Sequence, residues 1–98
     1  MPKRMELLFF ESGMIRAIAQ ALKVPYQICS GGYSLRFPNR DIYIIAAHEQ
    51  EHAIAIEVWA YGGRGTRMGT LLITLDFANP STSPEKIVEV IKKHQNGS

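Results

Sequence analysis

The sequence predicts an α+β fold, in which an antiparallel sheet of four to five strands and two helices, one N-terminal and one C-terminal, form a two-layer sandwich. Three observations predict it. Several short stretches carry an apolar residue at every second position and are separated by glycine-containing breaks, as strands joined by hairpins are. One stretch before them and one after them repeat apolar residues every three or four positions, as amphipathic helices do.

The N-terminal part of the chain predicts a short strand and then a helix. Residues 7–10 are apolar, and we favour a strand there over a first helical turn. Residues 12–23 form the predicted helix, because Ser12 can accept from a free backbone amide at its start and Pro25 disfavours helical backbone just after its end. The apolar stripe of this helix consists of Met14, Ile15, Ile18, Ala19 and Leu22.

Two hairpins follow. Residues 26–30 and 33–37 are predicted strands around Gly31-Gly32, a pair that suits a two-residue turn, and residues 42–47 are rich in β-branched and aromatic side chains. The central hairpin spans residues 52–77, with a glycine-rich loop at 62–69. Simple alternation places these side chains together on one side of the central hairpin: Ile54, Ile56, Val58 and Ala60 from its first strand, and Leu71, Ile73, Leu75 and Phe77 from its second.

The last element is a second amphipathic helix. Ser83 followed by Pro84 is a typical helix start, since Ser can cap the helix and proline lacks only an amide proton that would have no partner there. The acidic Glu85 near the start and the basic residues near the end match the helix dipole. Its apolar stripe consists of Ile87, Val88, Val90 and Ile91.

Length and composition predict one domain, residues 1–98, in the cytoplasm. The chain is too short for two independent cores, and no apolar run approaches the roughly 18 residues of a membrane span. The single Cys29 cannot form an internal disulfide, which fits a reducing compartment. A net charge of +2, spread along the chain, does not by itself indicate a polyanion-binding protein.

A short metal-binding pattern lies in the middle of the chain. Residues 48–52 read His-Glu-Gln-Glu-His and resemble the H-E-x-x-H pattern of zinc metallopeptidases. That resemblance implies zinc as cofactor, His48 and His52 as ligands and Glu49 as the catalytic general base. It requires a helix, whereas the flanking residues favour strands. The two alternatives are one helix through residues 41–60 and a polar bend between two strands, which would still bring the two imidazoles near each other.

The glycine-rich loop suggests a different partner. Arg64 and Arg67 on an exposed loop are suited to gripping phosphate, and strand aromatics could supply stacking surfaces for bases. A nucleic-acid-binding domain is therefore an alternative function. The more ordinary interpretation is a solvated loop beside tyrosines that serve packing.

The side of the central hairpin that carries Trp59 is unusually apolar. By alternation Trp59 and Tyr61 share this side, and we also place Leu72 on it. If both helices cover the opposite side, this surface is exposed and marks an interface or a ligand site; if one helix covers each side, it is core. We predict a non-enzymatic binding module, without a cofactor, that forms a homodimer through this surface or binds a protein or small-molecule ligand there.

Overall fold

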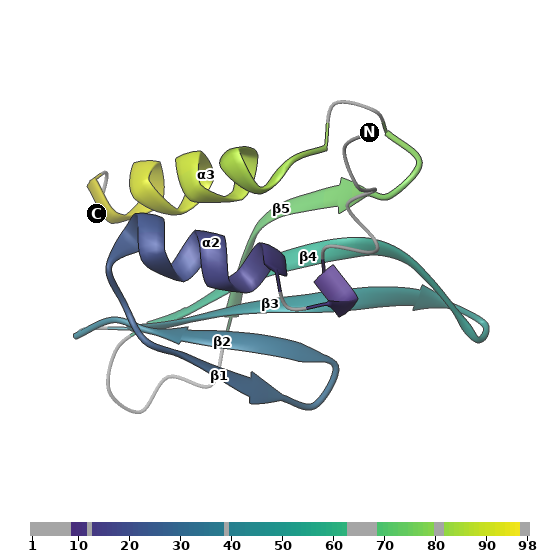
Figure 1. Ribbon diagram of the computed structural model, residues 1–98, viewed down its shortest axis with the longest axis horizontal. Helices are drawn as coiled ribbons and strands as arrows, with labels where there is room; N and C mark the ends of the chain where they lie inside the picture. The colour runs from purple at the N-terminus through teal and green to yellow at the C-terminus, as the bar shows by residue number, and fades with distance from the viewer. Residues whose placement is uncertain (1–8, 12, 39, 63–68, 80–81, 97–98) are drawn as a thin grey trace.

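The computed structural model describes residues 9–11, 13–38, 40–62, 69–79 and 82–96. Its elements are the helix α2 (Gly13–Leu22), the strands β1 (Tyr26–Cys29), β2 (Gly32–Arg36), β3 (Arg40–Glu49), β4 (His52–Gly62) and β5 (Gly69–Asp76), and the helix α3 (Pro84–Asn96). The strands form one antiparallel sheet in the order β1-β2-β3-β4-β5. The predicted fold class, with five strands and a helix toward each end, is confirmed (Figure 1).

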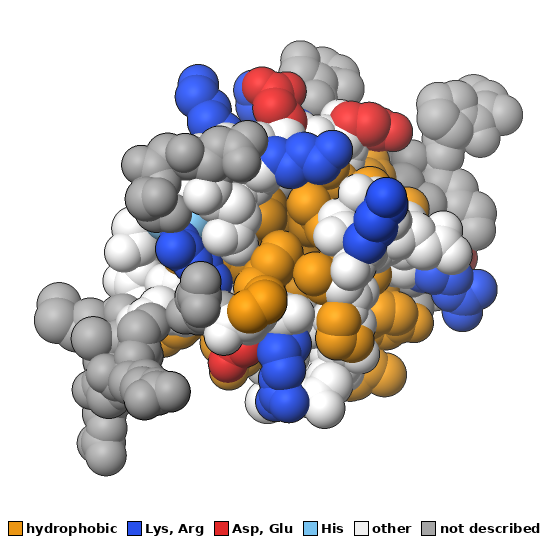
Figure 2. All heavy atoms as spheres, turned by 90° about the vertical axis from the view of Figure 1, so that its left-hand side faces the viewer, with side chains coloured by type: hydrophobic (Ala, Val, Ile, Leu, Met, Phe, Trp, Pro, Cys, Tyr) orange, Lys and Arg blue, Asp and Glu red, His pale blue; other side chains and the backbone are white. Residues whose placement is uncertain are grey.

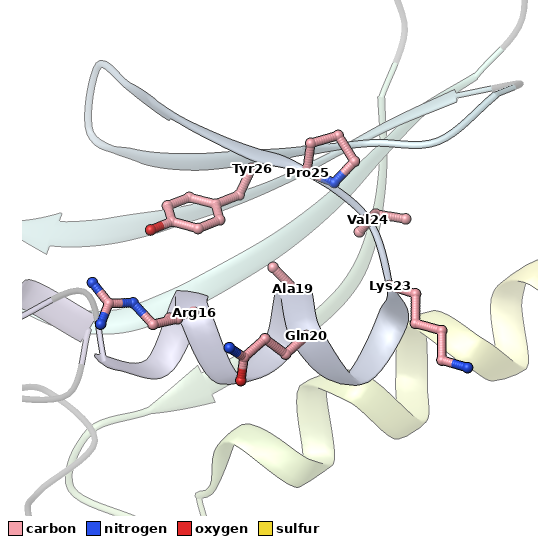
Figure 3. A pocket seen from close by; sticks show the side chains of 7 residues that line it. All are labelled: Arg16, Ala19, Gln20, Lys23, Val24, Pro25 and Tyr26. Carbon is pink, nitrogen blue, oxygen red and sulfur yellow. The ribbon is translucent and has the colours of Figure 1, made fainter.

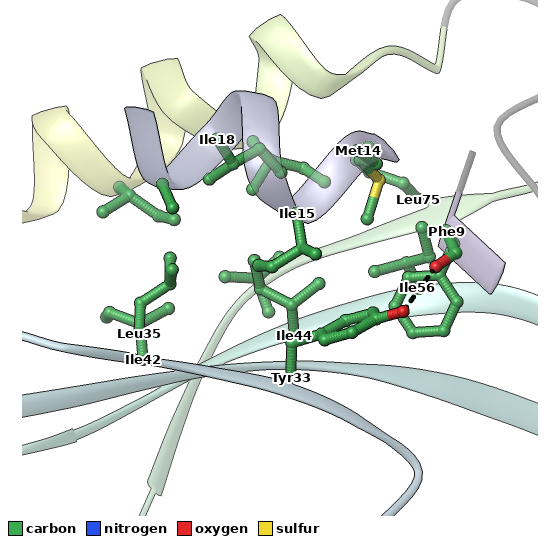
Figure 4. Close-up of a cluster of buried hydrophobic side chains, with 14 of the residues drawn as sticks. Phe9, Met14, Ile15, Ile18, Tyr33, Leu35, Ile42, Ile44, Ile56 and Leu75 are labelled. Atoms are coloured by element: carbon green, nitrogen blue, oxygen red, sulfur yellow. Dashed lines mark hydrogen bonds between the residues drawn. The ribbon is translucent and has the colours of Figure 1, made fainter. Parts of the chain in front are cut away.

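Both helices lie on the same side of the sheet (Figure 1). This decides the question that alternation left open, because one helix on each side would have buried both faces. Met14, Ile15 and Ile18 of α2 point at the strands, and Ile87 and Ile91 of α3 are fully buried (Figure 4). The side chains that meet them from the strands are Tyr33, Leu35, Ile42, Ile44, Ile56, Val58, Ala60 and Leu75. We call this side of the sheet the covered face.

The N-terminal residues correct one prediction. Phe9 and Phe10 are helical rather than part of a strand, and the rest of that predicted strand lies outside the described residues. Packing explains the difference: the Phe9 ring lies edge-on to the Tyr33 ring, with centroids 5.3 Å apart, and the Tyr33 hydroxyl donates to the Phe9 carbonyl at 2.9 Å (Figure 4). A run of four apolar residues is too short to reveal such tertiary contacts.

The first hairpin turns one residue earlier than predicted. Its turn residues are Ser30 and Gly31, with φ of 84° at Gly31, and Gly32 already belongs to β2. Gly32 is required for another reason, because a Cβ there would collide with the Ile44 carbonyl oxygen of β3. The two glycines therefore serve different purposes, one in the turn and one in close strand packing.

A β-bulge between β4 and β5 corrects the predicted faces of the central hairpin. Val58 pairs with Ile73, but the next residue, Trp59, pairs with Leu71, so Leu72 is an extra residue in β5. Leu72 consequently packs against the core, whereas Leu71 is 43% exposed on the Trp59 side. The sequence prediction had these two leucines the other way round, because strict alternation does not anticipate a bulge.

A second irregularity lies near the turn between β3 and β4. The register shifts between Ala47 and His48, so Ala47 pairs with Ala55 while His48 pairs with Ala53. Ile54 falls into this shift and is 41% exposed, although alternation predicted it to be in the core. Ile56, Val58 and Ala60 are buried as predicted.

Candidate functional site

The second face of the sheet is the candidate site. Residues paired across antiparallel strands point to the same side, so the registers define this face without ambiguity. Within the part of the chain that the structure describes, no helix lies over it (Figure 1). We call it the open face, and its side chains are Gln27, Cys29, Ser34, Arg36, Asp41, Tyr43, Ile45, Ala47, Ala55, Glu57, Trp59, Tyr61, Leu71, Thr74 and Asp76.

Three aromatic rings form a cluster in the middle of the open face. Tyr43 of β3 is the direct strand partner of Trp59 on β4, and Tyr61 follows Trp59 on the same side. The Tyr43 and Tyr61 rings meet edge to face with centroids 5.1 Å apart, and the Trp59 and Tyr61 rings are tilted with centroids 6.5 Å apart. We call these three residues the aromatic cluster. Such ring pairs hold each other in place beyond their burial, so the cluster is a preformed surface.

The neighbours of the cluster fix its orientation. The Trp59 indole Nε1 donates to Glu57 Oε1 at 3.2 Å, so the polar edge of the indole has a partner, and the residue as a whole is half-buried. The Tyr61 ring lies against Gly69 on β5, where an added Cβ would come within 2.6 Å of the ring. The glycine thus makes room for the aromatic ring on the neighbouring strand.

Apolar and charged side chains are distributed differently over this face. Ile45 and Leu71 border the aromatic cluster and extend its apolar area. Carboxylates lie on β3, β4 and β5, at Asp41, Glu57 and Asp76, whereas the described cation of this face is Arg36 at the end of β2. The face therefore combines an apolar, aromatic centre with a mostly acidic set of charges.

The metallopeptidase pattern does not lie on a helix. Its five residues are the ends of β3 and β4 with the turn between them, so the continuous helix through residues 41–60 is not formed. Glu49 pairs with His52 and His48 pairs with Ala53, which places the two imidazoles on opposite sides of the hairpin. Within the described residues, no group of three or more His, Cys, Asp or Glu side chains is arranged to hold a metal ion. Zinc binding by His48 and His52 and catalysis by Glu49 stay predictions from the pattern alone.

The other predicted binding residues divide into two groups. Trp59 and Tyr61 are on the open face, in contact with each other, as alternation predicted. Arg64 and Arg67 lie outside the described residues. The sequence analysis considered Tyr43 only among the aromatics that could stack on bases, and it did not assign Ile45 or Leu71 to the site. Only the strand registers and the bulge bring these residues beside Trp59.

Comparisons with known proteins do not assign a function to this site. No protein-family model matches the chain, and neither the curated proteins nor the solved structures contain a match to it. In the described part of the chain no helix is long and apolar enough to cross a membrane.

Proposed function

We propose that the protein is a cytoplasmic, non-enzymatic interaction module that forms a homodimer through the open face. The observation that carries this proposal is the aromatic cluster, which lies with Ile45 and Leu71 on a sheet face that no described element covers. Apolar surface of this kind marks interaction sites in soluble proteins, and aromatic side chains are enriched at the centres of interfaces. The single Cys29, which has no cysteine to pair with in the chain, supports the reducing compartment.

The size of the open face supports a second copy as its partner. The five strands are about 4.8 Å apart, and their lengths range from about 13 Å for β1 to roughly 30 Å or somewhat more for β4. The face therefore offers on the order of 600 Å². A standard interface buries about 800 Å² on each partner. Two open faces packed together would form a second core between two sheets, as in a sandwich of sheets.

The charges of the open face favour a protein partner over nucleic acid. Asp41, Glu57 and Asp76 are carboxylates, and phosphate backbones are bound through Lys and Arg. Arg36 and Asp76 lie at the periphery, and the centre is apolar and aromatic apart from Glu57, whose carboxylate accepts from the Trp59 indole; a mainly apolar centre with a polar rim is the usual anatomy of an interface.

Oligomeric state tests the proposal directly. Sedimentation velocity and light scattering, from low to high micromolar concentration, should show a monomer–dimer equilibrium. Because Trp59 is the chain's only tryptophan, its fluorescence should move to shorter wavelength as the dimer forms and the indole is covered. Leu71→Glu should weaken dimerisation by about tenfold or more, since it places a charge beside the aromatic cluster.

The matched control uses an equally apolar side chain away from this face. Ile28→Glu changes an exposed isoleucine whose strand partner is Tyr33, on the covered side, and it should leave dimerisation unchanged. If the wild-type protein stays monomeric at high micromolar concentration, the proposal is wrong. It is also wrong if Leu71→Glu and Ile28→Glu weaken the dimer equally.

A further inference from the structure

A groove on the helical side of the molecule is a second surface with its own chemistry. It lies between α2 and the start of β1, has a volume of about 490 Å³, and is lined by Arg16, Ala19 and Gln20 of α2, by Lys23 just after this helix, and by residues 24–26 (Figure 3). The open face is on the other side of the sheet. The groove is therefore separate from the surface that carries the proposed function.

One wall of the groove is polar and basic. Arg16 and Gln20 are four residues apart and share one side of α2, Lys23 follows the last residue of this helix, and all three are exposed. The backbones of Arg16 and Lys23 are about 10 Å apart along the helix direction, and their side chains point away from each other (Figure 3). No Asp or Glu is among the described residues that line the groove. At this end of the molecule Lys and Arg side chains stand around apolar ones (Figure 2).

The other wall is apolar. Ala19 is buried at the base, and the Tyr26 ring extends from the strand side toward α2 (Figure 3). Beyond Tyr26, two residues along β1 and on the same side of the sheet, Ile28 is 79% exposed. The apolar wall thus continues out of the groove along β1, which is a strand at the edge of the sheet.

Lys23 occupies a position where glycine is the usual residue. Its φ is 57°, its amide donates to the Gln20 carbonyl at 3.3 Å, and the Val24 amide donates to the Ala19 carbonyl at 3.1 Å. These two bonds form a Schellman motif, whose left-handed residue is most often glycine. A lysine there costs backbone strain, yet it adds a cation to the groove.

We propose that this groove binds a short acidic segment of another protein in extended conformation. Two carboxylates of the segment would pair with Arg16 and Lys23, and an apolar side chain between or beside them would pack on Tyr26 and Ile28. The charged ends of Arg16 and Lys23 are farther apart than their backbones (Figure 3), so the two acidic residues of the segment must be about four positions apart or more, which spans about 13 Å in an extended chain. A peptide suits the groove better than a small molecule because the apolar wall runs on along β1, whereas small-molecule sites enclose most of the ligand.

A titration with defined peptides tests this. The probe is a short peptide of alternating Glu and Leu residues, added to isotope-labelled protein while amide chemical shifts are recorded. The amides of Gln20, Lys23, Tyr26 and Ile28 should shift most, and the affinity should fall as salt rises because the paired charges are exposed. The same peptide with Lys in place of Glu should not bind. Equal binding of both peptides, or shifts centred elsewhere, would overturn the proposal.

Two variants locate the effect in the groove. Arg16→Glu combined with Lys23→Glu should reduce the affinity by about tenfold or more, whereas Arg36→Glu, which reverses an exposed cation on the open face, should not change it. Phenylacetate serves as a small-acid probe. If it saturates the same shifts at the same concentration as the peptide, the groove holds a small organic acid and the peptide proposal is wrong.

Lys23→Gly separates binding from folding. It keeps the Schellman geometry and relieves the strain, so the midpoint of thermal unfolding should stay the same or rise. The variant should nevertheless bind the Glu-Leu peptide severalfold more weakly, because one of the two cations is gone. A variant with unchanged affinity would show that Lys23 is only a helix cap, and would refute its part in the groove. This result does not depend on whether the open face dimerises.

Discussion

The covered face of the sheet is apolar throughout, whereas the open face is apolar only at its centre, and the two are built from different residues. The covered face is mainly aliphatic: Leu35, Ile42, Ile44, Ile56 and Val58 are all 0% exposed. Within the described ranges, no polar or charged residue is buried. The open face instead has an aromatic cluster, carboxylates and the partly exposed Leu71.

This difference in composition determines how each face interacts with the helices, with solvent or with a partner. Branched aliphatic side chains interlock with the helices and exclude water, which is the composition of a permanent core. Tyrosine and tryptophan combine a large apolar area with a polar group that tolerates water, so a face built from them is stable both when exposed and when covered by a partner. The covered face thus forms an obligate contact within the chain, and the open face has the composition suited to the reversible contact that we propose.

The largest expected effect comes from truncating neighbouring isoleucines of β3 that point to opposite faces. Ile44→Ala should lower the free energy of unfolding by about 2–5 kcal/mol, because it leaves a cavity in the fully buried core. Ile45→Ala, on the half-exposed open face, should cost less than about 1 kcal/mol in the monomer. Urea unfolding at low protein concentration compares the two.

Protein concentration sharpens this comparison. The cost of Ile45→Ala should rise with protein concentration if the open face is covered in a dimer, since association adds to the stability of the native state. The cost of Ile44→Ala should stay high throughout. Equal losses for the two variants at low concentration would show that the open face is already buried within the monomer.

The sequence predicted the elements better than it predicted the faces. Helix and strand positions follow from local periodicity, and Gly13–Leu22 and Pro84–Asn96 match their predicted positions closely. The assignments of Leu71, Leu72 and Ile54 failed because two register shifts reverse the alternation, and such shifts depend on pairing between strands. Likewise, residues 48–52 match the letters of a motif that requires a helix, but the residues on both sides of them form strands. The five residues therefore lie in a hairpin.

A smaller effect is expected from the polar group that anchors the N-terminal residues to the covered face. Tyr33→Phe removes the hydroxyl that donates to the Phe9 carbonyl and leaves that buried acceptor without this donor. The free energy of unfolding should fall by about 1 kcal/mol. Hydrogen exchange should show faster opening around Phe9 and Met14 than in β4. If exchange accelerates evenly across the sheet, the hydrogen bond does not act locally, contrary to this prediction.

The smallest effect concerns the turn that sets which residues of β3 and β4 face each side. Gln50 has φ of 57°, and Glu51, its neighbour in the turn, does not have positive φ. Positive φ at only the first central residue is typical of a type II′ hairpin turn, which favours glycine there. Gln50→Gly should therefore raise the free energy of unfolding by a few tenths to about 1 kcal/mol, since relief of strain exceeds the added flexibility of the unfolded chain. Glu51→Gly is the matched control and should lower it by about 0.5 kcal/mol, because glycine gains nothing at negative φ. Thermal unfolding of the two variants tests this prediction. If both variants shift stability in the same direction, Gln50 is not the strained position. The register of the hairpin is then set by the bulge and the cross-strand pairs instead.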